Sequence, residues 1–151
     1  MVTLKESLKN KLLNEEIPTS FDVIGNIALF SKLTSNLKKQ KLIANTLLRL
    51  NQNIKTVLLK TKKFSGKYRL PKFKILAGNK TKETSHNENN CKFKLDIEKC
   101  YFSPRLANER LRLSKQVKAS EVILVMFSGI ATYPIIISKN SKSKEIYAIE
   151  I

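Results

Sequence analysis

The sequence has little of several residue types, and each shortage excludes a class of protein. Its 151 residues include 2 Cys and 1 His, too few for a disulfide framework or a Cys/His metal site. Only 4 Gly and 4 Pro accompany 42% hydrophobic residues, a composition typical of a globular chain. No apolar run approaches the roughly 20 residues of a membrane-spanning helix, and the N-terminus lacks the apolar core of a signal peptide. We therefore expect a cytoplasmic protein with no metal, no membrane segment and two reduced thiols.

Acidic residues are absent from one long region of the chain. No Asp or Glu occurs between Val23 and Lys82, and this region holds most of the excess behind the net charge of +17. Basic residues recur throughout it: Lys32, Lys38, Lys39, Lys41, Arg49, Lys55, Lys60, Lys62, Lys63, Lys67, Arg69, Lys72, Lys74, Lys80 and Lys82. Because such self-repulsion does not stabilise a fold, we expect a polyanionic partner. Surface lysines that serve only solubility are the weaker alternative, since the same region lacks acids.

Periodicity predicts mixed helices and strands in the first half of the chain. Leucines at a spacing of four within residues 1–16 predict a short helix that ends before Pro18. Ile17 to Phe30 is typical of two strands joined by a turn at Gly25 and Asn26. The apolar residues of Leu37 to Leu50 recur at helical spacing, which predicts an amphipathic helix with a basic outer side.

A second set of strands is expected after that helix. Ile54 to Leu59 is rich in β-branched residues, and Tyr68 to Ala77 alternates as a half-exposed strand, with a basic turn from Lys60 to Lys67 between them. Pro71 argues for an edge position of the second strand. The polar residues 79–90 predict a loop or hairpin tip, and residues 91–101 predict a return to strand.

The next segment predicts a helix with charged residues on one side. Ser103 is the expected cap and Pro104 the first residue. Within RLANERLRLSKQV, helical spacing brings Arg105, Glu109 and Arg112 near one another.

Glu121 to Glu150 is the stretch around which the chain is organised. An apolar strand (Val122 to Phe127), a turn of small residues, a helix (Thr132 to Lys139) and a second apolar strand (Ile146 to Ile149) follow in order. This order predicts a parallel β-α-β unit, whose turn can approach an adenosine-bearing ligand while an acid about 20 residues later binds the ribose. Glu150 stands in that place. A β-α-β unit with one glycine also occurs in domains without a nucleotide, so the pattern alone leaves ligand binding open.

Several separated segments resemble one known family. IPTSFDVIGNIA, SGKYRLPKFKILAG, SPRLANERLRL, MFSGIATYP and YAIEI are similar, in this order, to motifs of the archaeal and eukaryotic tRNA (guanine-37-N1)-methyltransferase family. The resemblance implies an α/β protein: a basic mixed α+β tRNA-binding domain over residues 1–92, then the start of a class I, Rossmann-like methyltransferase domain over 93–151. It also implies S-adenosylmethionine as cofactor, the anticodon stem-loop of tRNA as partner, and a monomer.

The resemblance assigns expected roles to particular residues. Arg69 matches an arginine that stabilises developing charge on guanine O6, and Glu109 matches an acid that takes the N1 proton. Without the resemblance, a phosphate contact for Arg69 and a helix ion pair for Glu109 would be favoured. The expected cofactor-binding residues are Phe127, Ser128, Gly129, Ile130, Ala131 and Glu150. The expected RNA-binding residues are Lys60, Lys62, Lys63, Lys67, Lys72 and Arg105.

The sequence also departs from the family pattern. Asn26 and Val125 stand where the family has Asp, Asn90 and Ala131 where it has Gly, and Thr132 where a variant turn has Pro. Because the chain stops before the later motifs, we expect a partial sequence that binds tRNA in a salt-sensitive manner without transferring a methyl group. The alternatives are the related aminocarboxypropyl transferase of wybutosine synthesis and a non-catalytic basic RNA-binding module.

Overall fold

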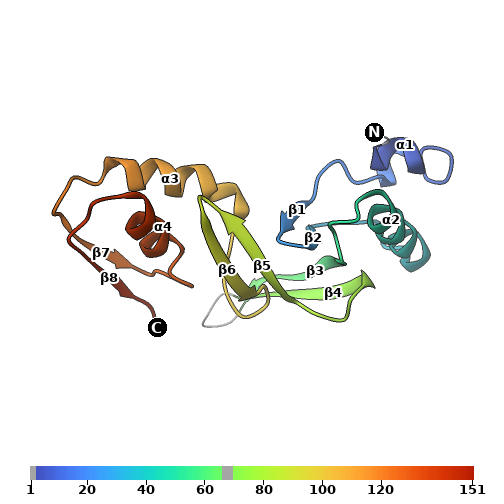
Figure 1. Cartoon of the computed structure of the whole chain (residues 1–151). Helices are drawn as coiled ribbons and strands as arrows, with labels where there is room; N and C mark the ends of the chain where they lie inside the picture. Colours follow the sequence, from blue (N-terminus) through green and yellow to red (C-terminus); the bar gives the residue numbers. More distant parts are fainter. Residues whose placement is uncertain (1–2, 66–69) are drawn as a thin grey trace. The chain divides into compact units, whose positions relative to one another are not determined.

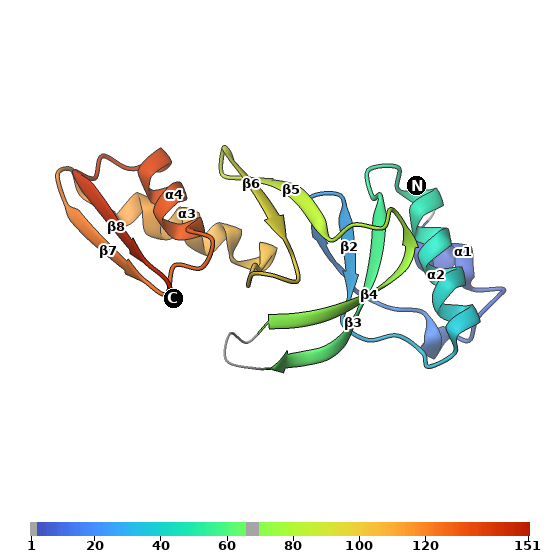
Figure 2. The same ribbon diagram turned by 90° about the horizontal axis from the view of Figure 1, so that it is seen from below.

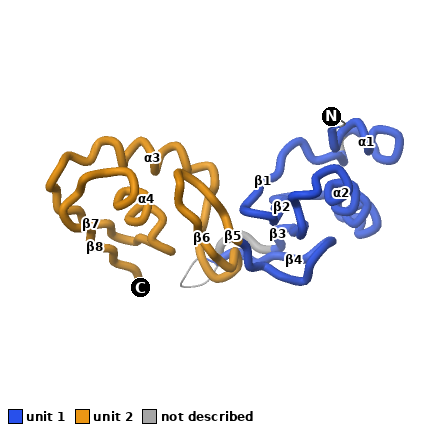
Figure 3. The backbone as a smooth tube through the Cα atoms, viewed as in Figure 1, with its two compact units in different colours: residues 1–84 blue, residues 85–151 orange. Residues whose placement is uncertain are grey.

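The computed structural model describes residues 3–65 and 70–151. Its elements are labelled in Figure 1. The chain forms two compact units, residues 1–84 (unit 1) and 85–151 (unit 2), which are coloured separately in Figure 3. Each unit is described by itself below. None of the helices in the described ranges is long and apolar enough to cross a membrane.

Unit 1 is built on a four-stranded sheet in the order β1-β2-β3-β4. β1 and β2 are antiparallel, β2 and β3 are parallel and joined through α2, and β3 and β4 are antiparallel. The bounds are α1 (Leu4–Leu8), η1 (Asn14–Glu16), β1 (Asp22–Ile24), β2 (Ile27–Phe30), α2 (Leu37–Leu50), β3 (Thr56–Ser65) and β4 (Leu70–Gly78).

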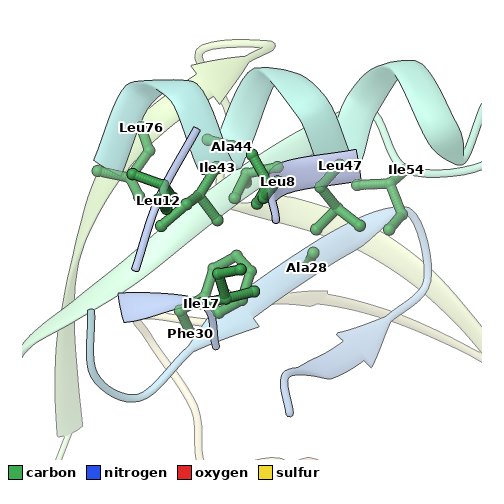
Figure 4. Close-up of a cluster of buried hydrophobic side chains, with 11 residues drawn as sticks. Leu8, Leu12, Ile17, Ala28, Phe30, Ile43, Ala44, Leu47, Ile54 and Leu76 are labelled. Carbon is green, nitrogen blue, oxygen red and sulfur yellow. The ribbon is translucent and has the colours of Figure 1, made fainter. Parts of the chain in front are cut away.

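The core of unit 1 lies between α2 and the sheet (Figure 4). Apolar residues at helical spacing, among them Ile43 and Leu47, face Ala28 and Phe30 of β2 and are all at most 4% exposed. Asn36 caps the N-terminus of α2, since its side-chain oxygen accepts hydrogen bonds from the N–H groups of two residues in the first turn, at 3.0 and 3.2 Å. This packing leaves the basic side of α2 to solvent.

Unit 2 contains a hairpin, two packed helices and a parallel strand pair. The hairpin strand β5 begins two residues before the boundary between the units. The bounds are β5 (Glu83–Glu88), β6 (Cys91–Asp96), η2 (Pro104–Leu106), α3 (Ala107–Gln116), β7 (Val122–Met126), α4 (Thr132–Asn140) and β8 (Glu145–Ile149). α3 packs against α4, and both helices lie on one side of the β7–β8 pair (Figure 2). The opposite face of that pair is apolar and exposed at Val122, Leu124 and Met126.

Most of the expected elements are confirmed. The turn at Gly25 and Asn26, the helix from Leu37 to Leu50, the edge position of β4 and the parallel β7–β8 pair all occur as predicted. The first helix is shorter than expected, since α1 ends at Leu8.

Two local expectations are wrong. β3 continues to Ser65 through the segment predicted as a basic turn, because its backbone pairs with β4 instead of turning. β5 occupies residues 83–88, where a polar loop or tip was expected, and the tip itself is Asn89 and Asn90. Ser103 and Pro104 occupy the expected cap and first positions, although the helix opens with the short η2 and Ser103 makes no side-chain capping hydrogen bond.

Candidate functional site

The candidate ligand-binding turn lies where β7 and β8 end. The two strands are parallel, with Met126 opposite Ile149, so the residues that follow each strand meet at one edge of the pair. Phe127, Gly129 and Ala131 have positive φ angles of 54°, 59° and 59°. These angles let the chain reverse tightly between β7 and α4. The N–H of Ser128 donates to the carbonyl of Ile149 at 3.0 Å, which ties the turn to the end of β8.

Glu150 is joined directly to this turn. Its Oε2 accepts a hydrogen bond from the backbone N–H of Gly129 at 2.6 Å. Ala131 precedes α4 and has no side-chain oxygen with which to cap the helix. The edge therefore combines an exposed carboxylate, which can accept hydrogen bonds from vicinal hydroxyls, with N–H groups at a helix N-terminus. Ile130 is the remaining residue of the turn. Val125, where the family has Asp, is half-buried on β7.

Glu109 lies on α3 in a two-point ion pair with Arg112. Both carboxylate oxygens of Glu109 accept from the guanidinium at 2.7 Å. The Arg112 hydrogen bonds lower the pKa of Glu109 below its ordinary value, so the carboxylate is ionised at neutral pH. Arg105, the other arginine expected near Glu109, is exposed on η2, and Arg110, the next residue along α3, is directed to a different partner.

That partner is Glu88, and the pair was not predicted from the sequence. Arg110 is 2% exposed, its Nη2 donates to Glu88 Oε2 at 2.6 Å, and its Nε donates to the other oxygen. His86 Nε2 lies 3.5 Å from the same carboxylate, but burial lowers the pKa of His86, so Arg110 supplies the balancing charge. No local signal in the sequence indicates this pair, because Glu88 and Arg110 are 22 residues apart.

The basic surface of unit 1 includes the β3–β4 pair. Unit 1 has 18 basic and 5 acidic residues, whereas unit 2 has 11 and 7. Lys60 of β3 is half-buried, and Lys72 and Lys74 are exposed on β4. Lys62 lies opposite Lys72 in the ladder, although the side chains of Lys62 and Lys63 are not described.

Two predicted residues, Lys67 and Arg69, lie outside the described residues. Both cysteines are free. Across residues 3–65 and 70–151, no three His, Cys, Asp or Glu side chains form a group that could hold a metal ion.

The fold and the turn together define a class of protein. A basic α/β unit is followed by a parallel β-α-β unit whose glycine turn contacts an acid after the second strand. This is the arrangement of nucleotide-type ligand sites in Rossmann-like domains. The chain belongs to the TRM5/TYW2 family: residues 3–81 match the TYW2 N-terminal domain, and residues 84–151 match the TRM5/TYW2 methyltransferase domain. The resemblance inferred from the motifs is thereby confirmed.

Curated relatives match across most of this chain. The chain is 39% identical over 92% of its length to tRNA (guanine(37)-N(1))-methyltransferase Trm5b of Pyrococcus abyssi, and it covers 42% of that protein. It is 42% identical over 87% of its length to the tRNA (guanine(37)-N(1))/4-demethylwyosine(37)-methyltransferase Taw22 of Nanoarchaeum equitans, and covers 43% of it. A 35% identical relative is a tRNA(Phe) (4-demethylwyosine(37)-C(7)) aminocarboxypropyltransferase of Methanocaldococcus jannaschii, of which 49% is covered. The chain thus spans less than half the length of these relatives.

Solved structures confirm the fold. The structure of Pyrococcus abyssi Trm5b matches 99% of this chain with a TM-score of 0.79 and 36% identity, over 43% of that protein. The M. jannaschii tRNA m1G37 methyltransferase gives a TM-score of 0.82 at 32% identity, with 99% of this chain and 44% of that protein covered. The fold is therefore the mixed α/β fold of these methyltransferases.

Proposed function

We propose that this chain serves a tRNA (guanine-37-N1)-methyltransferase that uses S-adenosylmethionine. The observation that carries the proposal is the hydrogen bond from Gly129 to Glu150 where the parallel strands end. It joins the carboxylate of Glu150 to the turn, and an acid after the second strand binds ribose hydroxyls in Rossmann-like domains, which supports the proposal. Related solved structures support the ligand, because one contains Trm5 with adenosine and another contains TYW2 with AdoMet.

The residues of the turn have a specific part in this proposal. Backbone groups of residues 127–131 contact the donor, and Glu150 accepts hydrogen bonds from its ribose. A carboxylate has two oxygens and about four acceptor sites, so Glu150 can do so while Oε2 keeps the N–H of Gly129. When bound, S-adenosylmethionine supplies an electrophilic methyl group. The exposed Phe127, 78% accessible, offers an apolar surface next to this position.

Glu109 is the proposed base at the guanine. Its carboxylate takes the N1 proton while the N1 lone pair forms a bond to the methyl carbon and the bond from that carbon to sulfur breaks. Arg69 is proposed to donate hydrogen bonds to O6 as negative charge develops there. Arg112 donates to both carboxylate oxygens of Glu109, so this ion pair must open before Glu109 can reach the target guanine.

The basic surface is the proposed site for the tRNA anticodon stem-loop. Six residues are proposed to contact RNA: Lys60, Lys62, Lys63, Lys67, Lys72 and Arg105. The charge excess of unit 1 supports this assignment, and a related structure is a complex of aTrm5 with tRNALeu. We further propose that residues 1–92 serve RNA binding and residues 93–151 donor binding, in a monomeric cytoplasmic protein.

Aminocarboxypropyl transfer from the same donor is the second candidate. The match of residues 3–81 to the TYW2 N-terminal domain favours it. The TM-scores favour methyl transfer, since a TYW2 of P. horikoshii gives 0.71 and a TYW2 of M. jannaschii gives 0.56, against 0.79 and 0.82 for two Trm5 structures.

Calorimetric titration of the chain with S-adenosylmethionine tests donor binding. Glu150→Ala should abolish the heat of binding, and Glu145→Ala, which removes an exposed acid from the other end of β8, should not. Equal binding by both variants would overturn the site. Mass spectrometry of nucleoside 37, after incubation with a tRNA transcript and donor, then distinguishes the reactions. A gain of a methyl group supports the first candidate and contradicts the expectation that residues 1–151 alone transfer none, whereas a gain of an aminocarboxypropyl group supports the second. An unchanged nucleoside is the result expected for residues 1–151 and does not by itself favour a non-catalytic RNA-binding protein.

A further inference from the structure

The buried pair of Glu88 and Arg110 has a third connection that ion pairing alone does not explain. Besides its two bonds to Glu88, Arg110 donates from Nη2 to the carbonyl of Ser103 at 3.0 Å. Its guanidinium carbon also lies 5.3 Å from the ring centroid of Phe102 and 5.9 Å from that of Tyr133. One side chain therefore contacts the hairpin, the segment before η2 and the start of α4.

Tyr133 links this cluster to the candidate donor turn. It is the second residue of α4, and Ala131, the last residue of the turn, directly precedes the helix. A guanidinium held over the Tyr133 ring restricts where the first turn of α4 can lie. The turn residues that approach Glu150 are joined to that helix without an intervening loop.

The tip of the hairpin makes a second attachment. The side-chain amide of Asn89 donates to the carbonyl of Ala107 in α3 at 2.9 Å, and the side-chain amide of Asn140, at the end of α4, donates to the carbonyl of Asn89 at 3.5 Å. The hairpin thus contacts both helices at its tip, while Glu88 holds Arg110 deeper in unit 2.

We infer that Arg110, oriented by Glu88, is a positioning residue for the donor turn. It fixes the first turn of α4 through Tyr133 and the segment before Glu109 through Ser103. The inference rests on the proposed donor site, and no contact of Arg110 with donor or RNA is involved, because the side chain is buried. The planar guanidinium of arginine has several donors in fixed directions, so it can bind Glu88 and the carbonyl of Ser103 together, which a lysine ammonium cannot do in the same geometry.

Arg110→Met tests the inference, with Lys115→Met as matched control on the exposed side of the same helix. We expect Arg110→Met to weaken S-adenosylmethionine binding about tenfold and to speed amide hydrogen exchange of residues 128–131. Lys115→Met should change neither quantity. Arg110→Lys should resemble Arg110→Met, because it keeps the charge and loses the fork.

A double variant separates positioning from simple stability. Replacing both partners, Glu88→Leu with Arg110→Met, removes the buried charges together, so the midpoint of thermal unfolding should return close to that of the unaltered chain. Donor affinity and slow exchange in the turn should not return, because the interactions with Ser103 and Tyr133 are still absent. Full recovery of both would overturn the inference.

The two proposals fail in different ways. If the unaltered chain binds no donor while Arg110→Met still speeds exchange in residues 128–131, the donor site is wrong and the positioning role stands. If the donor binds equally to the unaltered chain and to Arg110→Met, and exchange in the turn is also equal, the positioning role is wrong and the donor site stands.

Discussion

Gly78 shows how a single residue without a side chain determines local geometry. Its φ is +88°, and a Cβ built there would lie 2.1 Å from the carbonyl oxygen of Lys55. The N–H of Asn79 donates to that same carbonyl at 2.9 Å, so the backbone cannot move away freely. We expect Gly78→Ala to lower the free energy of unfolding by about 3 kcal/mol, measured by urea denaturation.

Gly129→Ala is the matched control for that measurement. Gly129 has a similar φ of +59°, but its nearest neighbour would be the Tyr101 carbonyl at 3.9 Å. Only the left-handed backbone conformation then disfavours the alanine, so Gly129→Ala should lower the free energy of unfolding by about 1 kcal/mol. Equal losses for the two variants would contradict the close approach at Lys55.

The pairing of Glu109 with Arg112 makes a prediction about pH. Hydrogen bonds from Arg112 lower the pKa of Glu109, so the stabilisation from this pair is present above the ordinary Glu pKa and is lost as the pH falls through the lowered value. Arg112→Gln should raise the pKa of Glu109 toward its ordinary value, because the hydrogen bonds that lower it are removed. Carbon NMR titration of the Glu109 carboxyl group measures the shift.

Lys115→Gln removes an exposed charge six residues after Glu109, beyond the i,i+3 and i,i+4 positions that can contact it, and should leave the Glu109 titration unchanged. If the pKa of Glu109 is the same in Arg112→Gln and in Lys115→Gln, Arg112 does not lower the pKa of Glu109.

At the scale of elements, the sequence predicts α2 to the residue and misses β5. The helix is predicted from the spacing of its apolar residues, which is a local signal, and the structure adds the Asn36 cap. β5 reads ETSHNE, and its buried positions are Thr84 and Glu88 rather than apolar residues. Glu88 is buried only because Arg110, 22 residues later, balances its charge, and that partnership has no local signature.

The turn and Glu150 could be predicted because parallel strands bring their C-terminal ends to one edge. Helical spacing narrows the ion-pair partner of Glu109 to Arg105 or Arg112 but cannot select between them. The tertiary structure selects Arg112 as the partner of Glu109, since Arg110 is buried against Glu88 and Arg112 pairs with Glu109 on the surface.

The hairpin tip makes a prediction about turn chemistry. Asn89 and Asn90 have φ angles of 48° and 62°, as in a two-residue type I′ turn. We expect Asn90→Gly to change the free energy of unfolding by less than about 0.5 kcal/mol and Asn90→Val to lower it by about 2 kcal/mol, because a β-branched residue tolerates this conformation poorly. Thermal unfolding followed by circular dichroism tests both variants, and a neutral Asn90→Val would show that the turn adopts another conformation.

At the scale of the whole molecule, the charge asymmetry makes a prediction about RNA. Each phosphate that a basic residue neutralises releases counterions, so affinity falls as salt rises. We expect binding of an unmodified tRNA transcript to weaken linearly on a log–log plot against salt concentration. Lys72→Gln with Lys74→Gln, two exposed residues of β4, should reduce the slope by about 1 for each phosphate that is no longer neutralised.

The control for this variant removes the same charge from the other unit. Lys142→Gln with Lys144→Gln has the same spacing and exposure, but both residues lie in the connection between α4 and β8, where acids are as near as Glu145. Filter binding at several salt concentrations should give this variant the slope of the unaltered chain. An equal reduction for both pairs would mean that net charge alone attracts RNA, and a slope of zero in the unaltered chain would exclude phosphate contacts by the basic surface of unit 1.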